Sequence, residues 1–131
     1  MVVLDTDILI GLLRNNGEDV TKIQELEQQY SNRYTTSISS YELLKGAYQS
    51  SNPSKGITQV STMLQSLTIL DFDFNSSKIS AQIFSYLKKK GVLTSSMDQM
   101  IAAIAISQGK ILVTRNAKHY QHIPHLKIEE W

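Results

Sequence analysis

The chain begins with a short apolar run that ends in two aspartates, Asp5 and Asp7, on either side of Thr6. An apolar segment follows at once, so the acids stand between a predicted strand and a predicted helix. Ligands of open α/β sheets bind beyond the carboxyl ends of the strands, so we expect Asp5 to face a ligand. A carboxylate held there among hydrophobic neighbours is favoured if a cation lies beside it. The alternative role for these residues is helix capping, and we expect Asp7 to be the plain cap.

Two further acids, Glu42 and Asp98, each follow a pair of serines at a predicted helix start. Residues 39–42 (SSYE) and 95–98 (SSMD) both match the capping box, in which an acid reaches back to the cap residue's amide. A helix N-terminus also lowers the pKa of a carboxyl and keeps it charged. Ionised carboxylates that cluster repel one another unless a cation joins them, and Mg²⁺ or Mn²⁺ prefers oxygen ligands. The three acids are therefore read either as caps or as one metal site.

The segment 113–120 (VTRNAKHY) is a predicted strand that runs into a polar turn, again at a carboxyl end. Asn116 is a turn or cap residue, or its amide oxygen faces a metal or a metal-bound water. Arg115 is either a phosphate contact or plain surface. Histidines recur at positions 119, 122 and 125. Because no acid or cysteine lies between them and Pro124 prevents a helix that would align them, we do not expect a histidine metal site.

Composition limits the class of protein. The chain has 131 residues, 41% of them hydrophobic and 19% charged, so we expect one folded domain over 1–131. The net charge of +1 is too small to attract nucleic acid to the molecule as a whole. Basic residues nevertheless gather at 88–90 and in the last quarter of the chain. With no cysteine, thiol chemistry is excluded, and we expect a cytoplasmic location. We expect no membrane span and no signal peptide.

Strands and helices are expected to alternate along the chain. Apolar runs predict strands at 2–4, 33–36, 67–70, 110–114 and 126–128. Helical spacing predicts helices at 8–14, 18–32 and 39–49, the first of them ended by an Asn-Asn-Gly breaker at 15–17. A further helix is expected after a loop at 50–54. Cap residues predict two more helices, one from Asn75 to the lysines before Gly91 and one from Ser95 or Ser96 to Gly109. This alternation predicts an α/β fold with a parallel sheet and helices on both faces.

Taken together, these segments resemble the PIN-domain ribonucleases, and among them the VapC-type toxins of toxin–antitoxin pairs. The resemblance runs in order through residues 3–10, 37–46, 98–105, 112–120 and 123–131. It implies a three-layer α/β/α fold with about five mainly parallel strands and an acidic pocket for Mg²⁺ or Mn²⁺. The family's acids fall on Asp5, Glu42 and Asp98. Its fourth position, often acidic, falls on Asn116, and this departure should weaken a second metal site.

The resemblance implies metal-dependent cleavage of RNA. Asp5 and Asp98 would hold the ion, with Glu42 close by or bound through water and a candidate to orient the attacking water. We expect products with 5′-phosphate and 3′-hydroxyl ends. The candidate substrate contacts are Thr6, Thr114, Arg115 and Lys118, with Arg14 and Lys45 as further phosphate contacts. The resemblance also implies a homodimer and a small antitoxin protein that inserts a helix among the acids.

Three alternatives remain open at this level. The first is a PIN nuclease of RNA processing or decay that is not a toxin. The second is a non-catalytic α/β binding or scaffold protein in which the acids are only helix caps. The third is a receiver-type phosphate-transfer domain, which would need a lysine at a late strand end, where this chain has Thr114 and Arg115.

Overall fold

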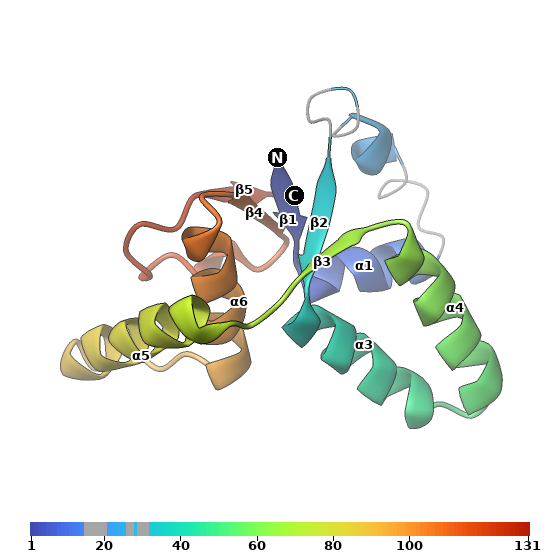
Figure 1. Cartoon of the computed structure of the whole chain (residues 1–131), viewed down its shortest axis with the longest axis horizontal. Coiled ribbons are helices and arrows are strands. Elements are labelled where there is room, and N and C mark those ends of the chain that lie inside the picture. The colour runs from blue at the N-terminus through green and yellow to red at the C-terminus, as the bar shows by residue number, and fades with distance from the viewer. Residues whose placement is uncertain (15–20, 26–27, 29–31) are drawn as a thin grey trace.

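A five-stranded parallel sheet forms the centre of the molecule in the computed structural model, which describes residues 1–14, 21–25, 28 and 32–131 (Figure 1). The strand order is β3-β2-β1-β4-β5, and every pairing is parallel. The strands are β1 (Val2–Leu4), β2 (Arg33–Thr36), β3 (Thr68–Leu70), β4 (Ile111–Thr114) and β5 (Ile128–Glu130). Around them lie α1 (Thr6–Leu13), α3 (Ser37–Tyr48), α4 (Pro53–Gln65), α5 (Phe74–Lys89), α6 (Ser96–Ser107) and the 3₁₀ turn η1 (Ala117–His119).

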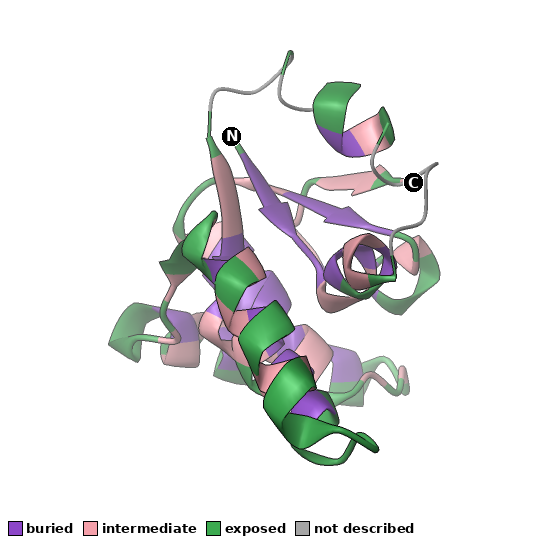
Figure 2. Cartoon of the chain, turned by 90° about the vertical axis from the view of Figure 1, so that its right-hand side faces the viewer, coloured by how far each residue is buried: buried purple, intermediate pink, exposed green. Residues whose placement is uncertain are grey.

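Helices cover both faces of the sheet, because alternate strand residues point to opposite sides. Val2 and Leu4 of β1 pack with α1, α3 and α4, whereas Val3 between them packs with α5 and α6. β4 divides in the same way, with Val113 on the first side and Leu112 on the second. Figure 2 shows the buried residues on the strands and on the inner faces of the helices. The predicted three-layer α/β/α fold is therefore confirmed.

The predicted strands agree well with the observed ones, except for the last. β5 is Ile128–Glu130 rather than 126–128, because it pairs with Leu112, Val113 and Thr114 of β4. An edge strand is not buried on both faces, so its glutamates can take part in the pairing, and the apolar run 126–128 misled the prediction. The part of the chain that the structure describes has no helix long and apolar enough to cross a membrane.

Several helices begin earlier than predicted because a different residue caps them. Asp5, not Asp7, is the N-cap of α1, and Thr36, not Ser39, is the N-cap of α3. Asp73, not Asn75, caps α5 by accepting from the amide of Ser76 at 2.8 Å. α4 begins at Pro53 inside the predicted loop, since proline suits the first position of a helix. The predicted breaker at 15–17 and much of the predicted helix 18–32 lie outside the described residues, although residues 21–25 are helical.

Two glycines allow a stability test of the backbone. Gly109 follows α6 with φ of +62°, which an alanine adopts only with strain, whereas Gly46 lies within α3 and has open space where a Cβ would be added. We expect Gly109→Ala to lower the free energy of unfolding by about 1 kcal/mol. We expect Gly46→Ala to raise it by about 0.5–1 kcal/mol, because alanine loses less backbone entropy in a helix. Chemical denaturation of both variants checks these opposite signs.

The strand order reverses direction between β1 and β4, which places the expected ligand crevice beyond their carboxyl ends. Leu4 pairs with Val113, and the amide of Asp5 extends the ladder by donating to the carbonyl of Val113 at 2.9 Å. Thr114 ends β4 beside Asp5. The fold thus brings the residues after position 4 and those after position 113 side by side.

Candidate active site

Asp5 is held at this crevice by contacts to both of its carboxylate oxygens. Oδ1 accepts from the amide of Thr6 at 2.9 Å, which caps α1. Oδ2 accepts from the hydroxyl of Thr114 at 2.8 Å and lies 3.0 Å from the hydroxyl of Tyr120. The residue is only 6% exposed. Capping and ligand binding are therefore not exclusive roles here, because Oδ1 caps the helix while Oδ2 lies beside Thr114 and Tyr120.

Burial makes the charge on Asp5 unfavourable. Removal from water raises the pKa of its carboxyl to about 6, and the neighbouring charge of Asp7 adds to the rise. The hydrogen bonds from Thr114, Thr6 and Tyr120 work in the opposite direction without cancelling the effect. A bound cation beside Asp5 would offset this cost. The electrostatics of the crevice thus favour a cation beside Asp5, which stays a prediction.

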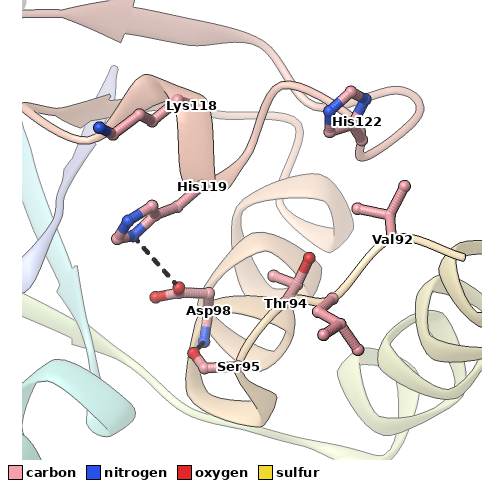
Figure 3. A pocket seen from close by; sticks show the side chains of 8 residues that line it. Val92, Thr94, Ser95, Asp98, Lys118, His119 and His122 are labelled. Carbon is pink, nitrogen blue, oxygen red and sulfur yellow. Dashed lines mark hydrogen bonds and ion pairs between the residues drawn. The ribbon is translucent and has the colours of Figure 1, made fainter.

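Asp98 comes to the same point from the start of α6. Its amide donates to the hydroxyl of Ser95, the N-cap, at 3.1 Å, which is one half of the predicted capping box. Its carboxylate is directed elsewhere, since Oδ1 lies 3.2 Å from the Tyr120 hydroxyl. Oδ2 lies 3.6 Å from Nδ1 of His119 (Figure 3). Asp98 therefore does not use its carboxylate for the second capping bond, and it shares the Tyr120 hydroxyl with Asp5.

The hydroxyl of Tyr120 joins the two aspartates, and the sequence did not single this residue out. Tyr120 is 1% exposed and packs with the α5 and α6 side of the sheet. Burial and the two carboxylates raise its pKa well above the ordinary value, so the hydroxyl keeps its proton and acts as a donor. The only sequence signal would have been an aromatic residue that closes the polar turn after the strand.

Glu42 lies one step further away. Its Oε1 is 2.9 Å from the hydroxyl of Thr6, which is also 2.9 Å from the hydroxyl of Ser39. The predicted capping box at 39–42 is wrong, because Thr36 is the cap and its Oγ1 accepts from the amide of Ser39. Glu42 is thus free to contact Thr6. Thr6 links Glu42 to Asp5, because its hydroxyl contacts Glu42 and its backbone amide donates to Oδ1 of Asp5.

Asp7 crosses to the turn after β4 instead of capping α1, which corrects the sequence interpretation. Its Oδ2 accepts from the side-chain amide of Asn116 at 2.8 Å and from the backbone amide of Arg115 at 3.1 Å. Its other oxygen, Oδ1, is buried and has no hydrogen-bond partner among the described residues. Asn116 therefore contacts Asp7, and the structure shows its donor side engaged there.

The four predicted substrate contacts divide into two pairs. Thr6 and Thr114 are engaged within the site by the hydrogen bonds to Glu42 and Asp5. Lys118 lines a pocket of about 390 Å³ that opens beside Asp98 and is walled by α6, η1 and the loop before α6 (Figure 3). Arg115 lines a separate hollow of about 290 Å³ with Asp7, Asn116 and Arg14. Lys45 lies on α3, with its Nζ 5.2 Å from the ring centre of Tyr41.

The donor set suits a hard divalent cation, since it consists of carboxylate and hydroxyl oxygens. The carboxylate of Asp5 is buried and repelled by Asp7, and Oδ1 of Asp7 accepts no hydrogen bond from the described residues. Within the described ranges, however, no three acidic or histidine side chains stand close enough to hold a metal ion. The structure thus brings Asp5 and Asp98 together and leaves Glu42 adjoining them through Thr6.

Comparisons with known proteins identify the family of this chain. The family model described as PIN domain matches residues 2–125. The chain is 33% identical over 129 residues to the tRNA(fMet)-specific endonuclease VapC of Salmonella typhimurium, covering 98% of this chain and 96% of that protein. It is 31% identical to Ribonuclease VapC2 of Haemophilus influenzae, with the same coverage.

Solved structures show the same fold. The DNA-bound VapBC of Salmonella typhimurium superposes with a TM-score of 0.91 at 32% identity, covering 99% of this chain and 97% of that chain. VapBC2 of Rickettsia felis, bound to a DNA fragment from its promoter, gives a TM-score of 0.92 at 26% identity, covering 100% and 99%. The chain therefore belongs to the PIN domain family and, within it, to the VapC branch.

Proposed function

We propose that this protein is a metal-dependent endoribonuclease and the toxin of a toxin–antitoxin pair. The observation that carries the proposal is the convergence of Asp5 and Asp98 on the Tyr120 hydroxyl at the strand-order reversal. The named relatives are ribonucleases, and the structural neighbours are VapBC complexes, which supports both parts of the proposal. A buried carboxylate in a crevice, with its pKa raised to about 6 by burial and a neighbouring acid, is typical of a functional site.

Asp5 and Asp98 would hold one Mg²⁺ or Mn²⁺, and Glu42 would act through a water molecule. When bound, such an ion lowers the pKa of its water and neutralises charge on the attacked phosphate. With asparagine at position 116 the site carries one negative charge fewer than a four-acid pocket. A second ion would therefore be held weakly and would arrive with the substrate's phosphate.

The chain's own residues orient the reactants. Glu42, positioned by Thr6, accepts a hydrogen bond from the attacking water, and Tyr120 keeps the two aspartates facing one point. Water adds to the phosphorus, the bond from phosphorus to the 3′ oxygen breaks, and that oxygen leaves with a proton. The products are a 5′-phosphate and a 3′-hydroxyl. Products that end in a 2′,3′-cyclic phosphate would rule this route out.

The RNA substrate is an unpaired segment, because bases in loops are exposed whereas a duplex hides them. The partner is a small antitoxin protein, and the protein acts as a homodimer in the cytoplasm. A hollow of about 280 Å³ beside the site suits the antitoxin, since apolar residues (Ile10, Leu13, Leu43) and Glu42 line it together. An arginine inserted among the carboxylates would replace the positive charge of the metal.

Cleavage of a mixed pool of structured RNAs tests the proposal. We expect purified protein to cut in Mg²⁺ or Mn²⁺ and to stop when EDTA is added. We expect Asp98→Asn to lower the rate by at least about a hundredfold, because it removes one of two direct ligands. Asp71→Asn is the matched control, an exposed aspartate in the loop before α5, and should leave the rate unchanged.

The outcome also separates the alternatives. Metal-dependent cleavage that is lost only in the site variant supports the nuclease. A protein that cuts no RNA and binds no divalent ion by calorimetry would be a scaffold whose acids serve as helix caps and turn contacts. A nuclease without an antitoxin would cut RNA but would hold no small partner protein, even if a short reading frame lay beside its gene and were co-expressed with it.

A further inference from the structure

Two adjoining surface hollows, together called the track below, lead from Asp98 to the C-terminal half of α5. We infer that the unpaired RNA strand next to the scissile phosphate lies along this track, and that Phe84 and Lys88 hold a nucleotide at its far end. The inference rests on the proposed function and states where on this chain its substrate lies.

Two adjoining hollows make up the track. The first is the pocket of about 390 Å³ beside Asp98, which Lys118, His119 and His122 line from one side (Figure 3). The second, of about 230 Å³, lies between α5 and the loop before α6 and is lined by Phe84 and Lys88. Residues 92–94 line both hollows, so the two hollows adjoin at this segment and together form the track.

The charges along the track suit a polyanion. Among the described residues that line the two hollows, Asp98 is the single acid, and it stands at the end where the metal would be held. Lys88 and Lys118 provide fixed positive charge, and the imidazoles of His119 and His122 provide N–H donors. Phosphate groups of RNA are attracted to such a surface, whereas the net charge of the whole chain is only +1.

The far end of the track has the features that bind single-stranded bases. The side chain of Phe84 is 53% exposed, and Lys88 lies one helical turn further with its Nζ 5.8 Å from the ring centre. Leu93, at the junction of the two hollows, is 99% exposed. An exposed aromatic ring next to a cation binds unpaired nucleotides by stacking and charge neutralisation. The apolar wall and the basic groove are thus continuous with the catalytic acids.

Steady-state cleavage of a short unpaired oligoribonucleotide tests the track. We expect Phe84→Leu, which keeps an apolar side chain but removes the stacking surface, to raise KM about tenfold with little change in kcat. Phe84→Trp should restore the wild-type KM. Lys88→Gln should raise KM several-fold. It should also make the negative slope of log affinity against log salt concentration shallower by about 0.7, the value for one phosphate contact on a single strand.

The same helix supplies a matched control outside the track. Phe74 is 68% exposed, and the Nζ of Lys78 lies 5.6 Å from its ring centre. Lys78 follows Phe74 by four residues, as Lys88 follows Phe84. We expect Phe74→Leu and Lys78→Gln to leave KM and the salt slope unchanged. Equal effects at both pairs would show a general loss of charge or folding and would overturn the inference.

The remaining outcomes separate this inference from the proposed function. If the wild-type protein neither binds nor cuts the labelled oligoribonucleotide, both fail together. If it cuts and the Phe84 and Lys88 variants match it, the nuclease stands and the track is wrong. If these variants keep normal RNA kinetics but lose the antitoxin in a pull-down, the surface binds protein instead, and the inference is likewise overturned.

Discussion

Replacing Asp5 with asparagine should raise the free energy of unfolding of the metal-free protein at pH 7 by about 2 kcal/mol while it abolishes RNA cleavage. Asparagine has nearly the same shape but no charge to bury. The wild-type carboxyl is only 6% exposed, and its pKa is raised to about 6 from 3.8, first by burial and then by Asp7. The charge that the reaction needs is therefore a charge that destabilises the empty fold.

The dependence of stability on pH follows from the same pKa. Between about pH 4 and pH 6 the folded protein keeps a proton on Asp5 that the unfolded chain has released. The free energy of unfolding of the wild-type protein should therefore fall as pH rises through this range, by up to about 3 kcal/mol from this group alone. Above about pH 6 this contribution is constant, and in Asp5→Asn it is absent.

Urea denaturation in EDTA at a series of pH values, with wild-type and Asp5→Asn protein side by side, measures both effects. Asp98→Asn is the control, because that side chain is 23% exposed and its replacement should remove cleavage without the same gain in stability. Adding Mg²⁺ should then stabilise the wild-type protein and leave Asp5→Asn unaffected. A lower stability of Asp5→Asn at pH 7 would mean that the hydrogen bonds to Asp5 outweigh the burial of its charge.

The fold could be predicted from the sequence because apolar runs and helical spacing are both local patterns. Apolar runs at 2–4 and 110–114 indicated buried strands, and helical spacing between them indicated the crossovers of a parallel sheet. The last strand was misplaced because only one edge of β5 is paired, which allows Glu129 and Glu130 to take part. Helix starts were misplaced because several residues in a row could cap, as at Thr36 and Ser39, and only the tertiary structure selects one.

The candidate site was predicted only in part, for a related reason. Asp5, Glu42 and Asp98 were identified because each stands where a strand or helix end exposes a carboxylate. Whether an acid at such a position caps its helix or faces a ligand depends on residues far along the chain. Asp7 was assigned to capping, but it holds Asn116, which is 109 residues away. No spacing rule in the sequence links residues that meet only after the sheet has formed.

Tyr120 is the clearest case of such a long-range contact, and Tyr120→Phe should lower cleavage by about 10- to 100-fold. The phenyl ring keeps the packing against the α5 and α6 side, so only the hydroxyl that joins Asp5 Oδ2 and Asp98 Oδ1 is lost. Without it, the two carboxylates have no common donor and hold their relative positions less well. We also expect the free energy of unfolding to fall by about 1.5–3 kcal/mol, the range for a hydrogen bond to a charged group.

Measuring kcat and KM together with the Mg²⁺ concentration for half-maximal rate distinguishes a positioning role from loss of folding. Tyr34→Phe is the matched control, because among the described residues its hydroxyl bonds to the sulfur of Met1 alone, at 3.5 Å and exposed to solvent. In Tyr120→Phe we expect a lower kcat and a higher Mg²⁺ requirement with KM nearly unchanged, since the Tyr120 side chain is buried and offers no surface to the RNA. An unchanged Mg²⁺ requirement would show that the aspartates hold their places without the tyrosine, and the hydroxyl would then serve the core alone.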